Sequence, residues 1–167
     1  MNKPVLTLVA ATVALALGRP AAALELGAPL ADGQGRLAAG LQTSFVSGGL
    51  SLKYRVTEKV TAQGTLGVLG SLTNYGVRGL YHFTEEDFWS AYGFGGVGLW
   101  RYDGGRFFRS ESVFGVNGGA GVEYDLRGLA PTLPAVFVSG ELGLGVANFD
   151  NYSFSSVGLG FGLHYRF

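Results

Sequence analysis

The sequence contains no cysteine and little charge. Only 14% of its 167 residues are Asp, Glu, Lys or Arg, whereas soluble domains average about 25%. The absence of cysteine fits an exported protein that does not rely on disulfides. Twelve acidic residues balance twelve basic ones, so the chain lacks the basic surface that nucleic acids require. A chain this poor in charge would aggregate in water unless its apolar side chains were buried, and we therefore expect its exterior to face lipid.

The first residues have the pattern of a cleaved signal peptide. Lys3 precedes an apolar run from Val5 to Leu17, and three alanines, 21–23, follow it as an A-x-A-like cleavage site. The run is shorter than the roughly 20 residues of a membrane-spanning helix. Without Lys3 and Arg19, ten basic residues remain against twelve acidic ones, a net charge near −2. The expected division is a signal peptide at 1–23, a periplasmic lead-in at 24–35 and a transmembrane β-barrel at 36–167.

Glycine and aromatic residues are abundant, with 29 Gly, 12 Phe, 8 Tyr and 2 Trp. From Arg36 onward, apolar residues alternate with small or polar ones, the period of β-strands. The alternation is clearest at 156–167, where a helix would scatter both sets of residues. One face of that segment carries Val157, Leu159, Phe161, Leu163, Tyr165 and Phe167.

Turn residues divide this region into eight expected strands. In the fifth, the parity of the large side chains changes around Gly95 and Gly96, which predicts a β-bulge there. An even number of strands places both ends of the barrel on the periplasmic side. The approximate limits are 36–45, 50–56, 59–69, 72–83, 88–102, 114–125, 136–146 and 156–167.

Alternation alone does not distinguish a membrane barrel from a soluble, lipocalin-like one, because each has one apolar face. The polar face here is mostly glycine with Ser, Asn and a few ionisable side chains, whereas a soluble barrel would turn a charged face to water. Glycine suits the narrow interior of an eight-stranded barrel. We therefore expect lipid on the apolar face, with aromatic girdles near both ends. These would contain Tyr75, Trp100, Tyr102, Phe114, Tyr152 and Phe154 outside, and Tyr54, Tyr81, Phe83, Phe88, Tyr92, Tyr124, Tyr165 and Phe167 on the periplasmic side.

With its signal peptide, Gly-rich alternating strands and last residues Leu163-His164-Tyr165-Arg166-Phe167, the chain resembles the small outer-membrane β-barrel superfamily of OmpX and the OmpA transmembrane domain. The resemblance covers roughly 36–167. It implies an all-β fold, an eight-stranded antiparallel up-and-down barrel in the bacterial outer membrane. It also implies that Phe161, Leu163, Tyr165 and Phe167 form the signal for the barrel-assembly machinery. OmpX-like members carry long protruding extracellular strands, and the short loops here differ from them.

Ionisable residues on the inward parity form an expected polar network in the lumen. Arg78 and Glu141 lie at similar depth near mid-barrel, and we expect them to pair, because an unpaired buried charge is costly. Such a network is either a gated ion path or a polar core that blocks passage, and eight strands favour the latter. The expected members are Lys53, Arg55, Arg78, His82, Glu123, Asp125, Glu141, His164 and Arg166.

Little catalytic chemistry is visible. His82 and His164 suggest a metal pair or a Ser-His lipid hydrolase, but no third metal ligand and no nucleophile motif accompany them. We expect a non-enzymatic protein without cofactor or metal, with a structural or interaction role in the envelope. A lipid A- or phospholipid-modifying enzyme and a narrow, porin-like pore are the alternatives. The expected partners are outer-membrane lipid and the assembly machinery, with no nucleic acid, for a monomeric chain.

Overall fold

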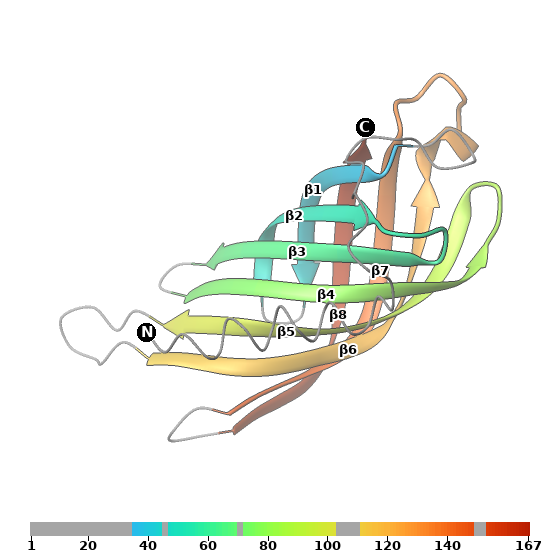
Figure 1. The fold of residues 1–167 in the computed structure, drawn as a ribbon. Helices are drawn as coiled ribbons and strands as arrows, with labels where there is room; N and C mark the ends of the chain where they lie inside the picture. Colours follow the sequence, from blue (N-terminus) through green and yellow to red (C-terminus); the bar gives the residue numbers. More distant parts are fainter. Residues whose placement is uncertain (1–34, 45–46, 70–71, 103–110, 149–152) are drawn as a thin grey trace, which may run out of the picture.

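The structure is a computed structural model that describes residues 35–44, 47–69, 72–102, 111–148 and 153–167 (Figure 1). The expected signal peptide and residues 24–34 of the lead-in lie outside the described residues. Among the described residues, no helix is long and apolar enough to span a bilayer. The strands are β1 (Leu37–Ser44), β2 (Ser47–Arg55), β3 (Val60–Leu69), β4 (Leu72–Glu85), β5 (Trp89–Tyr102), β6 (Glu111–Asp125), β7 (Val136–Asn148) and β8 (Ser153–Arg166), with a 3₁₀ turn, η1 (Leu126–Gly128), after β6.

The eight strands form one closed barrel. Each pairs antiparallel with its neighbour in sequence, and β1 pairs with β8 from Ala38↔Arg166 to Thr43↔Phe161. The predicted fold class, an all-β antiparallel up-and-down barrel, is confirmed. The described chain starts and ends at the same end of the barrel, which we call the terminal end. This end also holds the connections 56–59, 86–88 and 126–135.

The register of the strands makes the barrel strongly sheared. Ala39 faces Tyr165 directly across the β1–β8 seam. The paired residues can also be followed from Ala39 in the other direction, through β2 to β7. This row arrives in β8 at Ser155, ten residues away from Tyr165. Such a stagger tilts the strands by about 35 to 45° to the barrel axis. The row passes through Leu52, Gly64, Val77, Val97, Val116 and Val146.

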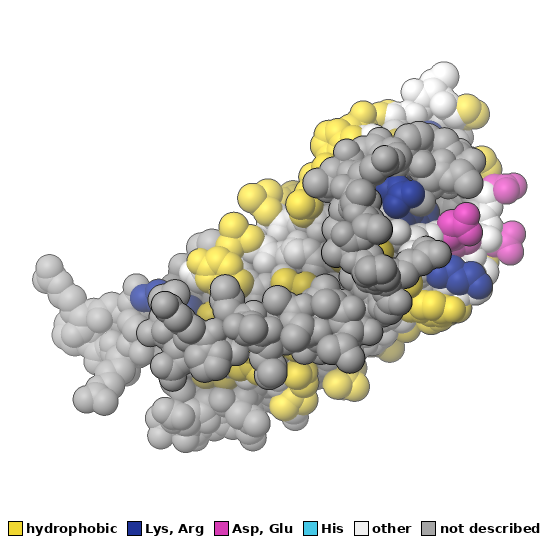
Figure 2. All heavy atoms as spheres, in the orientation of Figure 1, with side chains coloured by type: hydrophobic (Ala, Val, Ile, Leu, Met, Phe, Trp, Pro, Cys, Tyr) yellow, Lys and Arg dark blue, Asp and Glu magenta, His cyan; other side chains and the backbone are white. Residues whose placement is uncertain are grey.

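Polar side chains fill the interior and apolar ones cover the exterior. Among the described residues, fourteen buried side chains are polar or charged and six are hydrophobic, whereas Leu50, Leu142 and Phe161 are 64%, 58% and 61% exposed. Figure 2 shows hydrophobic side chains along the outer surface of the strands. A water-soluble domain has the opposite distribution. The core of this molecule is therefore its polar lumen.

Two aromatic residues placed by the sequence on the lipid side lie inside. Tyr92 is fully buried and Trp100 is 5% exposed, so their assignment to the girdles is wrong. The predicted bulge at Gly95 and Gly96 is also wrong, because β5 pairs with β4 and β6 there without a shift. The register shifts instead in β4, between His82 and Thr84.

Glycines on the neighbouring strand β6 make room for the inward aromatic side chains of β5. A Cβ added to Gly121 would lie 2.8 Å from the Tyr92 ring, and one added to Gly119 would lie 2.9 Å from the Phe94 ring. Both distances are shorter than van der Waals contact. The glycine-rich inner face of β6 and the aromatic inner face of β5 are therefore complementary in volume.

Candidate functional site

The centre of the lumen holds a buried ion pair. Strand β4 directs Arg78 inward, and β7 directs Glu141 toward it from the facing wall. The Arg78 guanidinium donates from Nη1 to Glu141 Oε2 at 2.8 Å and from Nη2 to Oε1 at 2.7 Å. Both side chains are at most 5% exposed. Tyr92 Oη donates a further hydrogen bond of 2.8 Å to Glu141 Oε1. Such bidentate, charge-assisted contacts are among the strongest polar interactions in proteins.

A chain of hydrogen bonds leads from this pair across the barrel. Arg78 Nε donates to Gln63 Oε1 at 2.8 Å, which turns the Gln63 amide nitrogen toward Ser51 Oγ at 2.6 Å. Ser51 Oγ also forms a hydrogen bond with His164 Nε2, 2.9 Å away. Side chains from six strands thus interlock across the lumen.

A second charged cluster lies nearer the terminal end. Lys53 pairs with Glu123, whose other carboxylate oxygen lies 3.5 Å from Arg166 Nη2. The Arg166 guanidinium stacks over the Phe137 ring, 3.8 Å from its centroid. Three residues of the expected network therefore meet in one cluster, separate from the central pair.

The remaining expected residues have other partners. Arg55 pairs with Glu85 of β4, and Asp125 accepts from the backbone and side chain of Arg127. The hydrogen bond to Asp125 raises the pKa of the Arg127 guanidinium, so the Arg127 side chain stays charged. His82 contacts Thr61 Oγ1 at 3.2 Å and Ser90 Oγ at 3.3 Å.

The polar network expected from the sequence does not contain Ser51, Gln63 or Tyr92. Ser51 and Gln63 have inward parity, so alternation alone would have found them. Tyr92 had no such signal, because its strand was assigned the wrong phase. The two histidines take different partners, and among the described residues no group of three or more His, Cys, Asp or Glu side chains could hold a metal ion.

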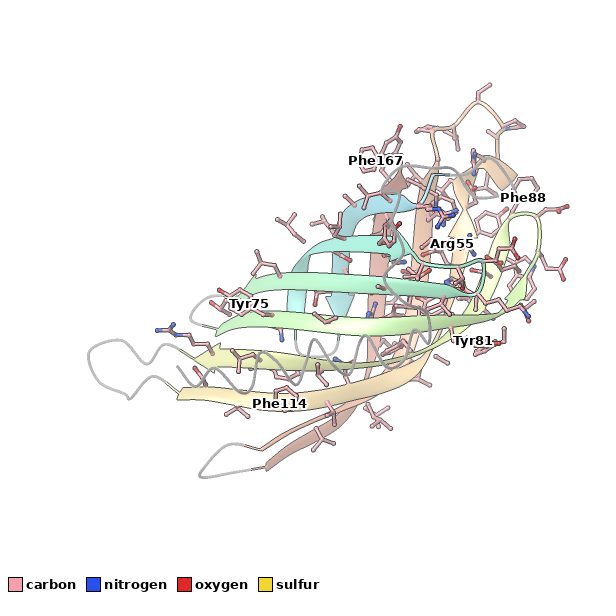
Figure 3. All side chains as sticks on the ribbon, in the orientation of Figure 1. Arg55, Tyr75, Tyr81, Phe88, Phe114 and Phe167 are labelled. Atoms are coloured by element: carbon pink, nitrogen blue, oxygen red, sulfur yellow. The ribbon has the colours of Figure 1, made fainter. Side chains whose placement is uncertain are left out.

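The lumen is open at the terminal end and narrows inward. The mouth is a cavity of about 340 Å³ between charged and aromatic side chains, among them Arg55, Glu123 and Phe137. Figure 3 shows Arg55 at the same end of the barrel as Phe88 and Phe167. Deeper in, the space beside His164 falls to about 20 Å³, room for about one water molecule. Leu80, which lines this space, is 1% exposed, and Tyr92 is 0% exposed.

The contact between Ser51 and His164 has the separation of a catalytic dyad. However, Ser51 is 4% exposed and His164 is 1% exposed. His164 Nδ1 has no hydrogen-bond partner, so no carboxylate orients the ring. The nearest space, about 20 Å³, does not admit an acyl chain. In this geometry the pair links two walls of the barrel.

The last strand presents its apolar face outward to the end of the sequence. Leu163, Tyr165 and Phe167 are 50%, 45% and 64% exposed, respectively. The Phe167 amide donates to Leu37 O at 2.9 Å, which continues the seam between β8 and β1. The rings of Tyr165 and Phe167 meet edge to face, 5.1 Å apart.

The barrel is similar to solved outer-membrane structures. The N-terminal β-barrel domain of Pseudomonas aeruginosa OprF matches with a TM-score of 0.54 and 15% identity, over 78% of this chain and 95% of that chain. The crystal structure of the attachment invasion locus protein Ail of Yersinia pestis matches with a TM-score of 0.43 and 18% identity, over 78% and 93%. The structure of Ail in a phospholipid bilayer nanodisc matches with a TM-score of 0.42 and 16% identity, over 78% of this chain and 97% of that chain. No protein-family model and no curated protein sequence matches the chain. The match to the OprF domain shows a shared fold, as the sequence resemblance implied.

Proposed function

We propose that this chain is a non-enzymatic, monomeric protein of the bacterial outer membrane, with a structural or interaction role in the envelope. The observation that carries the proposal is the inside-out distribution of side chains, with ion pairs buried in the lumen and Leu, Val and Phe exposed around a closed wall. A closed barrel satisfies its backbone hydrogen bonds without an open edge, as hydrocarbon requires. The fold shared with the OprF domain supports the same location.

The exposed aromatic residues support this placement in a bilayer. Tyr75 and Phe114 lie toward one end of the barrel, and Tyr81, Phe88 and Phe167 lie toward the terminal end (Figure 3). All five are at least 45% exposed. Aromatic side chains favour the two membrane interfaces. The terminal end would then face the periplasm.

Labelling of single cysteines tests the membrane placement, and the absence of native cysteine makes it clean. Leu142→Cys, on the outer wall, should react with lipid-soluble reagents only. Glu86→Cys, in an exposed connection, should react with water-soluble maleimide. The protein should also fractionate with outer membranes and show heat-modifiable gel mobility. Ready reaction of the Leu142→Cys variant with water-soluble maleimide, or recovery of the protein in periplasmic extract, would exclude the proposal.

The side chains that fill the centre of the lumen favour a structural role over conduction. The central ion pair and Tyr92 fill the barrel where the passage would run. We therefore expect no single-channel steps in planar bilayers at salt concentrations where porins conduct. Stable unitary conductance would favour the pore instead.

The buried position of Ser51 and His164 argues against lipid modification at that pair. Mass spectrometry of lipid A and phospholipids, with and without the protein, should give identical spectra. A mass change that required His164 would favour the enzyme.

A further inference from the structure

The connection between β6 and β7 differs from the two others at the terminal end. It has ten residues, 126–135, whereas 56–59 and 86–88 are tight turns. Figure 1 shows it rising clear of the barrel between η1 and β7. The other two connections carry acidic residues, such as Glu58 and Glu86, whereas residues 128–135 contain no charged side chain.

This connection exposes apolar side chains. Leu129 is 72% exposed and Leu133 is 39% exposed. Pro131 and Pro134 are exposed beside them. These four exposed apolar side chains lie within six residues of sequence, and clustered exposed apolar surface is typical of a site that contacts a partner or a membrane.

Hydrogen bonds hold the connection in shape. The Leu129 amide donates to Leu126 O at 3.0 Å, and the Leu133 amide donates to Ala130 O at 3.0 Å. At its start, the Asp125 carboxylate accepts from the Arg127 amide at 2.9 Å. The exposed leucines are therefore fixed outward and do not fold back on the barrel.

The base of the connection lies on the outer side of the rim. A Cβ added to Gly128 would lie 2.5 Å from Tyr124 Oη and 2.7 Å from Phe88 Cγ. Tyr124 has the outward parity of Val122, which is 54% exposed, and Phe88 is 45% exposed. The base of the loop thus packs against aromatic side chains at this end of the barrel.

We propose that residues 129–134 form an anchor that seats in the headgroup region of the periplasmic leaflet, a proposal that rests on the membrane placement given above. Interfacial segments present exposed apolar side chains to the boundary between headgroups and acyl chains. Leu129 and Leu133 supply these side chains. The anchor sets how deeply the barrel sits, because it fixes one rim against the interface.

A depth measurement tests the anchor. Leu129→Cys, Leu142→Cys and Glu86→Cys are each labelled with bimane and refolded into phospholipid vesicles that contain brominated lipids. Bimane at 129 should be quenched most by bromines near the glycerol backbone, and bimane at 142 most by bromines deep in the chain. Bimane at 86 should be quenched by aqueous iodide and little by either lipid.

The outcomes separate the anchor from the membrane placement. If bimane at 142 is lipid-quenched while bimane at 129 behaves like bimane at 86, the anchor is wrong and the barrel placement stands. If bimane at 142 also responds only to iodide, the placement itself is wrong. Shielding at 129 that grows with the protein-to-lipid ratio, without bromine quenching, would mean that a second copy covers the loop, which also overturns the anchor.

A second set of variants tests which side chains hold the loop in lipid. Bimane is attached to Pro131→Cys in both proteins. The test variant also carries Leu129→Ser and Leu133→Ser, and the matched control carries Thr132→Ser instead. Quenching by shallow bromines should fall to the level of Glu86→Cys in the double-serine variant and stay unchanged in the control. Heat-modifiable mobility verifies that each variant is folded. Equal quenching in the folded double-serine variant would overturn the proposal.

Discussion

Arg78 and Glu141 are charged groups that water scarcely reaches. Their two hydrogen bonds, with those to Gln63 and Tyr92, replace the solvent that each charge lost on folding. Compared with an apolar core, such a pair adds little stability. Removal of one partner, however, leaves the other as an unpaired buried charge, which is strongly destabilising. The pair is thus more important for keeping the lumen in one arrangement than for the net free energy of folding.

We predict that Arg78→Met and Glu141→Gln each lower the free energy of unfolding by about 3 to 5 kcal/mol. The double variant Arg78→Met/Glu141→Gln should lose less than the sum, since neither charge is then left alone. Urea titration of the refolded protein measures all three, with Glu58→Gln in an exposed connection as the control. Equal stabilities for the wild type and both single variants would show that the pair has no energetic role.

Two glycines, Gly119 of β6 and Gly79 of β4, should respond differently to the same substitution. A Cβ at Gly119 would lie 2.3 Å from the Leu142 carbonyl oxygen and 2.9 Å from the Phe94 ring, whereas one at Gly79 meets nothing within 4 Å. We predict that Gly119→Ala costs about 1 to 3 kcal/mol through overpacking. Gly79→Ala should stay within about 0.5 kcal/mol of the wild type. Urea midpoints that agree for the two variants would contradict the packing described here.

For single strands, the sequence predicts where a strand begins and ends better than which of its side chains point into the lumen. The predicted limits of the third and fourth strands, 59–69 and 72–83, compare with Val60–Leu69 and Leu72–Glu85. Alternation also assigns the faces of 156–167 in the last strand correctly, because large apolar side chains occupy only one of them. In β5 it fails, since both faces combine glycine with large side chains, Gly93 and Gly95 outward, Gly96 and Gly98 inward. Only the facing glycines of β6 and β7 decide which aromatic rings fit inside, and that is tertiary information.

A substitution on the outer face of β7 tests how deeply this face lies in the bilayer. Leu142 lies mid-strand between Ala120 of β6 and Leu159 of β8. We predict that Leu142→Arg costs about 2 to 4 kcal/mol in a bilayer, while Leu37→Arg, at the end of β1, costs about 0 to 1 kcal/mol. Unfolding from lipid vesicles measures both. The same cost at the two positions would mean that Leu142 does not lie at the depth proposed.

For the whole molecule, the period of two and the chemistry of the polar face are sufficient to predict a closed barrel. The cost of an open edge in hydrocarbon also predicts that the last strand pairs with the first, and the pairing of β8 with β1 confirms it. Contacts between side chains inside the lumen were harder to predict. They depend on the stagger of the strands, which decides which residues of different strands lie at the same depth in the barrel. Glu85, for example, lies at the end of β4 and pairs with Arg55 of β2 across β3. A biological role does not follow from the fold, since one fold hosts many functions.

The assembly of the barrel in cells provides the last prediction, at Phe167. In the structure its side chain is 64% exposed, and its amide adds one hydrogen bond to a seam already paired from Ala38 to Thr43. Deletion of Phe167 should therefore have little effect on refolding into detergent. If the C-terminal aromatic is part of the assembly signal, as the family resemblance implies, the same deletion should strongly reduce outer-membrane insertion in cells. Phe88→Ala, which removes another exposed aromatic at the same end, is the control and should insert normally. Quantitative blotting of outer-membrane fractions, with heat-modifiable mobility as the folding readout, compares the variants. Wild-type levels of folded, membrane-inserted protein after the deletion would show that Phe167 is an ordinary interfacial aromatic, and an equal loss in detergent would show that its role is structural.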